Sequence, residues 1–187
     1  MELSADIDEQ MMHDMEIDKK TLQMVREHLP PSGTKIGEYV FLGSDDLWFG
    51  TVGLLHPFVT VAEDRWPMGD GFLLVVMIDG PVYIAELDSN DTAAKIDDYN
   101  TLDLRQDNLV AYCAADFPKF MEIMRLYTTA LETNPNPDDV FDEKGYERLK
   151  KAGTMLRQQI EKIDSKAVED INGFWSTIIE EFEAGMW

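Results

Sequence analysis

The residues best able to do chemistry in this chain are three histidines, one cysteine and many carboxylates. His13, His28 and His56 have no second histidine three or four residues away, and none is close in sequence to Cys113. Metal sites depend on recognisable ligand spacings, and the methionine-rich run at 11–15 does not provide one. We therefore predict no metal site and no cofactor.

Cys113 lies in the apolar run Val110–Ala114, where a cysteine is expected to behave as a small buried hydrophobic residue. A cysteine nucleophile needs an activating base, and the sequence identifies none. The chain has no Gly-x-Ser-x-Gly elbow, and Gly69-Asp70-Gly71 lacks the third glycine of a dinucleotide-binding loop. The sequence therefore predicts no catalytic residue, and we expect the protein not to be an enzyme.

Paired carboxylates are the remaining candidates for catalysis, and they occur at Asp45/Asp46, Asp88/Asp91 and Asp97/Asp98. With 37 Asp and Glu in the chain, such pairs arise by chance. The stretch from 88 to 91 also lacks the ladder of oxygen ligands that a calcium loop needs. We interpret the pairs first as solvated surface, second as a partner-binding patch and third as the acids of a hydrolase.

The acidic residues are densest between positions 63 and 107, where eleven Asp and Glu face only three basic residues. Trp66, Tyr83 and Tyr99 stand among them, and an aromatic anchor within a polar frame is typical of protein interfaces. The alternative is that Trp66 and Tyr83 are core residues and the acids face water. On the first interpretation the partner-binding residues are Asp45, Asp46, Glu63, Asp64, Trp66, Asp70, Glu86, Asp88, Asp97, Asp98 and Tyr99.

The formal net charge of -21 indicates what kinds of partner to expect. Such a charge strains a compact fold, so it reflects solubility, a salt-rich cytoplasm or a basic partner. Nucleic acid is excluded as a direct partner because neutralising phosphates requires Lys and Arg. The longest apolar run, Phe72–Ile78, is too short to span a membrane. An acidic N-terminus unlike a signal peptide and a single cysteine favour a cytoplasmic location.

These residues must be positioned by a set of short strands preceded by one helix. A capping Asp18 and apolar residues on one face predict a helix at 18–29, which Pro30-Pro31 ends. Turn residues Gly43–Asp46 predict a hairpin of Tyr39–Leu42 with Leu47–Val52, and Asp79-Gly80 predicts a second hairpin. The second hairpin joins Phe72–Ile78 to Val82–Leu87. Further strands are expected at Phe58–Ala62 and Leu109–Ala114, with a polar loop at Asp88–Asn100.

The rest of the chain has helical periodicity. We predict helices at Phe117–Leu131, Asp142–Ile163 and Gly173–Ala184, of which the first and last are capped by Asp116 and Asn172. Gly185 is placed to end the last helix. The order helix, strands, helices predicts an α+β fold, a mainly antiparallel sheet covered by an N-terminal helix and C-terminal helices. We assign residues 1–17 to an acidic arm and 18–187 to one domain.

Three segments resemble one known protein family. They are Asn108–Phe120 (NLVAYCAADFPKF), the tail from Ile163-Asp164-Ser165-Lys166-Ala167 through Phe174-Trp175 to Gly185, and more loosely Gly69–Tyr83. They look like the strand-to-helix element, the C-terminal helix and the middle hairpin of the SUKH superfamily, which has the Syd-like fold. The tail is most similar to the fourth immunity-protein branch of that superfamily.

The resemblance implies a non-enzymatic bacterial protein that neutralises a cognate toxin by binding it. Such toxins are often nucleases or enzymes that modify nucleic acids, so the expected partner is a basic toxin domain used in competition between bacteria. The acidic surplus agrees with such a partner, because an acidic protein can occupy a basic cleft. A carboxylate-dependent hydrolase and a regulatory scaffold or adaptor remain the alternatives, and the oligomeric state stays open.

Overall fold

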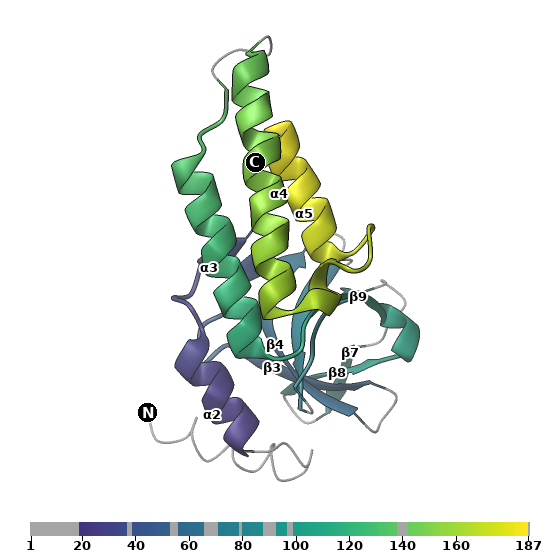
Figure 1. Cartoon of the computed structure of the whole chain (residues 1–187). Coiled ribbons are helices and arrows are strands. Elements are labelled where there is room, and N and C mark those ends of the chain that lie inside the picture. Colours follow the sequence, from purple (N-terminus) through teal and green to yellow (C-terminus); the bar gives the residue numbers. More distant parts are fainter. Residues whose placement is uncertain are drawn as a thin grey trace.

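A computed structural model describes residues 19–36, 39–52, 56–65, 71–78, 80–87, 93–96, 99–137 and 142–186. Helix α2 (Lys19–His28) precedes the strands, and three longer helices follow them (Figure 1). The α+β class predicted from the sequence is therefore confirmed. Within these residues, no helix is both long enough and apolar enough to cross a membrane.

The strands form one curled sheet in the order β7-β8-β3-β4-β5-β6-β9, with β1 and β2 beside β4. Neighbouring strands pair antiparallel except β3 and β8, which are parallel. The strands are β1 (Lys35–Ile36), β2 (Tyr39–Phe41), β3 (Trp48–Val52), β4 (His56–Arg65), β5 (Gly71–Met77), β6 (Val82–Leu87), β7 (Ala93–Ile96), β8 (Tyr99–Leu104) and β9 (Leu109–Ala114).

Strand β4 differs most from the sequence prediction. The expected hairpin between residues 39–42 and 47–52 is wrong, because β2 and β3 both pair with β4 and lie end to end along it. Val52 to Trp48 face His56 to Thr60, and Phe41 faces Ala62. A bulge between Thr60 and Ala62 lets one long strand serve both short ones.

The second predicted hairpin is confirmed. β5 and β6 pair from Val76 opposite Val82 to Gly71 opposite Leu87, and Gly80 in the turn has a φ of 115°, which favours glycine. The predicted loop at 88–100 is wrong in part, because β7 and the start of β8 fall within it. The two strands pair with each other, and β8 also pairs with the distant β3, which no local pattern indicates.

The sheet is apolar on both faces at its centre. Leu74 and Val76 of β5 face a core shared with the helices, whereas Leu73 and Val75 face a second core inside the curl. The alternation follows from the period of two along a strand. A continuous apolar run such as Phe72–Ile78 is therefore what a strand buried on both sides requires.

The C-terminal helices α3 (Phe117–Thr133), α4 (Glu143–Ile163) and α5 (Phe174–Ala184) form a layer that covers one face of the sheet and projects beyond it (Figure 1). Asp116 caps α3 as predicted, through a 2.8 Å hydrogen bond from the Lys119 amide. Asn172 is not the cap of α5; Gly173 occupies that position without a side-chain bond. Gly185 ends α5 with a φ of 70°, as predicted.

The aromatic residues of α5 pack into the core. Trp175 is fully buried, and its indole N–H donates to the carbonyl of Cys113 at 2.9 Å. Its ring packs against Phe120, Tyr127 and Phe174, which joins α5 to α3 above the end of β9. Cys113 is itself buried, as its apolar surroundings in the sequence predict.

Candidate partner-binding surface

Five of the eleven predicted partner-binding residues have described side chains: Asp45, Asp46, Glu63, Asp64 and Glu86. Trp66, Asp70, Asp88, Asp97 and Asp98 lie outside the described residues, and Tyr99 is described only as part of the backbone of β8. The predicted surface can therefore be judged on two acidic regions, one on the sheet and one beside α2.

The acidic region on the sheet is a row of three residues across β4, β5 and β6. Asp64 lies opposite Phe72, and Phe72 lies opposite Glu86. Residues that face each other across a ladder project to the same side of a sheet, and neighbouring strands are about 4.8 Å apart. The backbones of Asp64 and Glu86 are thus about 10 Å apart, with the Phe72 ring between them. We call these three residues the acidic row.

The exposure of the acidic row suits a contact surface. Glu86 is exposed, whereas Asp64 and Phe72 are half-buried. Phe72 also packs against the core that the sheet shares with the helices, so its ring is held by the fold. Asn108 fixes the backbone of β6 at this point, because its amide donates to the Glu86 carbonyl at 2.9 Å. The row is therefore placed on rigid strands.

Tyr39 extends the acidic row onto β2. Val40 lies opposite Glu63 on β4, and the preceding Tyr39 is close enough to Asp64 to sense its charge. Burial is the main cause that raises the pKa of Tyr39 above its ordinary value of 10.0, and the nearby acidic groups of Cys113 and Asp64 raise it further. Its hydroxyl consequently keeps its proton at neutral pH, and its ring contacts Phe174 edge-on at 5.8 Å.

Glu63 does not join the row, although the sequence places it next to Asp64. It lies opposite Leu73, and Leu73 belongs to the core inside the curl, so Glu63 projects to the other face. Because side chains alternate along β4, Glu63 and Asp64 point to opposite faces of the sheet, although both belong to the predicted partner-binding residues.

Asp45 and Asp46 form the second acidic region. They are exposed in a turn that the Asp46 amide closes by donating to the Gly43 carbonyl at 3.0 Å. This turn and the segment Pro30–Ser32 line a shallow hollow, together with Arg26 of α2. A basic side chain at its edge makes the hollow less acidic than the sequence suggests.

Phe72 and Tyr39 belong to the surface although neither is among the partner-binding residues predicted from the sequence. The sequence predicts Phe72 as part of an apolar strand, and in the structure its side chain is half-buried. The sequence signal for its partial exposure is its position as the first residue of the apolar run 72–78. Tyr39 had no signal at all, because its neighbour Asp64 is set by the pairing of β2 with β4.

Elsewhere in the described residues, no group of three or more His, Cys, Asp or Glu is arranged to hold a metal ion. Comparison of the chain with protein-family models, with curated proteins and with solved structures finds no match.

Proposed function

We propose that this chain binds and neutralises a basic toxin domain, and that the acidic row forms part of the contact surface. The observation that carries the proposal is the alignment of Asp64, Phe72 and Glu86 on three adjacent strands. Two carboxylates on either side of an aromatic ring complement an arginine or lysine, which can pair with the acids and lie on the ring.

The same geometry favours binding over hydrolysis. Phe72 stands between Asp64 and Glu86 in the strand register, where a shared water or metal ion of a two-carboxylate mechanism would have to lie. On this proposal the two acids meet separate positive charges of the partner. Electrostatic complementarity of this kind accelerates association and excludes wrong partners.

The resemblance of residues 163–185 to the immunity-protein branch of the SUKH superfamily supports a toxin as the partner. The net charge of -21 supports a basic one. The partner is then a nuclease or another toxin whose cleft binds nucleic acid, because such clefts are rich in Lys and Arg.

The test is affinity capture from the lysate of the source organism with three forms of the chain. These are the native chain, the isosteric Asp64→Asn/Glu86→Gln variant and a control, Glu132→Gln/Glu169→Gln, that removes two exposed charges elsewhere. The native chain and the control should retain one basic protein at low salt and lose it as ionic strength rises. The acidic-row variant should bind that protein at least about tenfold more weakly.

A second step decides whether the partner is a toxin. The captured protein, expressed alone, should stop bacterial growth, and co-expression of the native chain should restore it. Capture of a housekeeping protein with no effect on growth would instead establish the scaffold or adaptor function. Equal binding by the acidic-row variant and the control would exclude the acidic row as the contact surface.

A further inference from the structure

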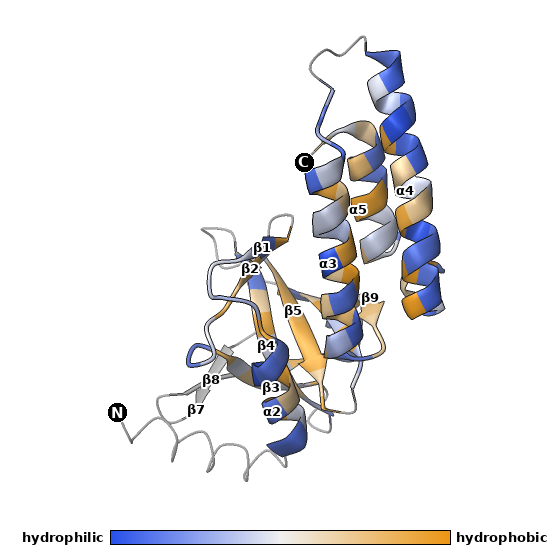
Figure 2. Cartoon of the chain, turned by 60° about the vertical axis from the view of Figure 1, so that its left-hand side comes forward, coloured by the Kyte–Doolittle hydropathy of each residue, from blue (hydrophilic) through white to orange (hydrophobic). Residues whose placement is uncertain are grey.

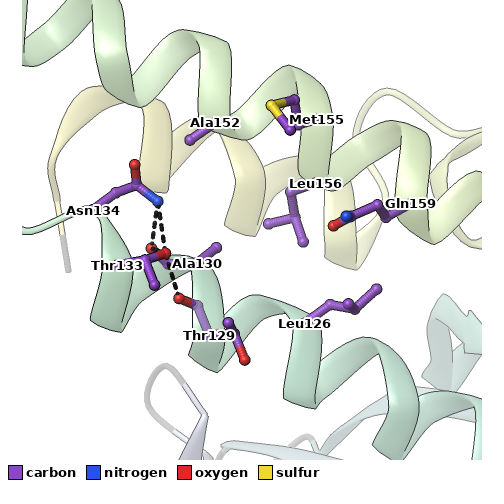
Figure 3. A pocket seen from close by; sticks show the side chains of 9 residues that line it. All are labelled: Leu126, Thr129, Ala130, Thr133, Asn134, Ala152, Met155, Leu156 and Gln159. Atoms are coloured by element: carbon purple, nitrogen blue, oxygen red, sulfur yellow. Dashed lines mark hydrogen bonds between the residues drawn. The ribbon is translucent and has the colours of Figure 1, made fainter.

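An open groove runs between α3 and α4 on the side of the helical layer away from α5 (Figure 3). It holds about 350 Å³. Leu126 and Ala130 of α3 and Ala152, Met155 and Leu156 of α4 give it an apolar floor, and Asn134 closes one end. The remaining lining residues are uncharged and polar: Thr129, Thr133 and Gln159.

Met155 marks the groove as an exposed apolar site. Met155 is 53% exposed and is one of four exposed large hydrophobic residues in the described part of the chain. Methionine adapts its shape to varied apolar partners and is over-represented at surfaces that bind helices. A groove of this form, about two helical turns long from Ala152 to Gln159, suits the apolar face of an amphipathic helix.

The α4 edge of the groove is basic, although the chain as a whole is strongly acidic. On a helix of about 3.6 residues per turn, four basic residues lie within about 40° of Met155. They are Lys144, Arg148, Lys151 and Lys162, and all four are exposed. The three acids of α4 lie about 80° or more away from Met155; they are Glu143, Glu147 and Glu161.

Three basic residues of α4, one of them in the basic edge, are used within the fold. Arg157 donates to the Ser176 hydroxyl of α5 at 3.1 Å. The charges of Arg157 and Lys150 oppose the burial that raises the pKa of Glu183 on α5. Arg148 donates to the Pro135 carbonyl at 2.7 Å, which fixes the chain between α3 and α4. Within the part of the chain that the structure describes, Lys144, Lys151 and Lys162 make no such interaction, so their charges are available to a partner.

We propose that the α3–α4 groove binds an acidic amphipathic helix of another protein. Its apolar residues would lie on Leu126, Ala130 and Met155, and its carboxylates would face Lys151 and Lys162. Charge complementarity selects this occupant. A second copy of the chain docked through the same groove would bring two basic α4 edges together, and a basic toxin would be repelled by them. The site is therefore independent of the acidic row.

The experiment measures binding of two fluorescein-labelled synthetic helices of about 18 residues to the full chain by fluorescence anisotropy. Both helices carry leucines at i, i+4 and i+7; one has glutamates on the flanking positions and the other has lysines. Charge reversal at the groove, Lys151→Glu/Lys162→Glu, is compared with a control reversal at exposed sites elsewhere, Lys20→Glu/Lys35→Glu. The Met155 methyl signal, assigned with Met155→Leu, reports where the helix binds.

The glutamate helix should bind saturably, shift the Met155 methyl signal and bind at least about tenfold tighter than the lysine helix. The groove reversal should invert that preference, whereas the control reversal should keep it. Absence of binding by the glutamate helix, equal affinity for both helices, or an unshifted Met155 signal would each overturn the proposal.

Discussion

Replacing Asp164 by asparagine should destabilise the fold more than the corresponding amide substitution at any other described Asp or Glu. The Asp164 carboxylate is buried between α4 and the end of β9, where η2 (Ser165–Val168) begins. One oxygen accepts from the Tyr112 hydroxyl at 2.9 Å and from the Ala115 amide at 2.6 Å. The other accepts from the Lys166 amide at 3.2 Å. Asp164 thus joins the helical layer to the sheet.

The magnitude follows from the three hydrogen bonds. An asparagine keeps one oxygen, so its NH₂ group turns toward a donor and leaves at least one bond unmade. A hydrogen bond to a charged group contributes about 1.5–3 kcal/mol, and an unsatisfied buried donor costs about 1–3 kcal/mol. We expect Asp164→Asn to lower the free energy of unfolding by about 3 kcal/mol. For a chain of this size, that corresponds to a Tm lower by about 6–12 °C.

The assay is urea and thermal unfolding followed by circular dichroism. Tyr112→Phe removes one of the three bonds and should cost about 1–2 kcal/mol. The control is Asp107→Asn, which removes an exposed ion pair with Arg105 at 3.4 Å and should cost less than about 1 kcal/mol. If Asp164→Asn costs no more than that control, or if its effect adds fully to that of Tyr112→Phe, the proposed network is refuted.

Three further predictions concern pH and single side chains. Burial is the main cause that raises the pKa of the Cys113 thiol above 9.0 and of the Tyr39 and Tyr112 hydroxyls above 10.0, so the native state holds these protons more tightly. The free energy of unfolding should therefore be fully retained below about pH 9 and fall as pH rises further, as urea titrations between pH 7 and 11 would measure. Gly185→Ala should lower the free energy of unfolding by about 1–2 kcal/mol in the same assay, because residue 185 has a left-handed φ of 70° that disfavours a side chain. Trp175→Phe should lower it by about 2–4 kcal/mol, because it removes the buried hydrogen bond to the Cys113 carbonyl and leaves a cavity; a loss below about 1 kcal/mol would contradict that role.

The sequence predicts the elements whose signals are local. Asp116 caps α3, Gly80 supports the hairpin of β5 and β6, and the run at 109–114 is β9 to the residue. Each of these features depends on a side chain and on backbone within a few residues of it, so a short stretch of sequence is enough to predict it.

The sequence predictions fail for the elements whose position is fixed by pairing with a strand distant in the sequence. The turn at Gly43–Asp46 is real, but β4 supplies the partner for both flanking strands, so no hairpin forms. The sequence does not predict β7 and β8, because β8 is placed by a parallel pairing with the distant β3 and β7 is placed by pairing with β8. The acidic row also depends on distant pairing. The sequence predicts Asp64 and Glu86 as partner-binding residues, but their alignment with Phe72 depends on the registers of β4, β5 and β6.

The positions of the charges in the fold indicate more about possible partners than the net charge does. A net charge of -21 alone predicts one kind of partner, a basic one. In the fold, however, the acidic row lies on the strands, whereas the basic edge lies on α4, a largely hydrophilic helix that packs against α3 and α5 (Figure 2). Exposed charges further apart than about 10 Å are largely screened from each other at physiological ionic strength. On the two proposals, a basic partner is selected by the acidic row and an acidic helix by the basic edge of α4, so each partner is attracted by charges that repel the other.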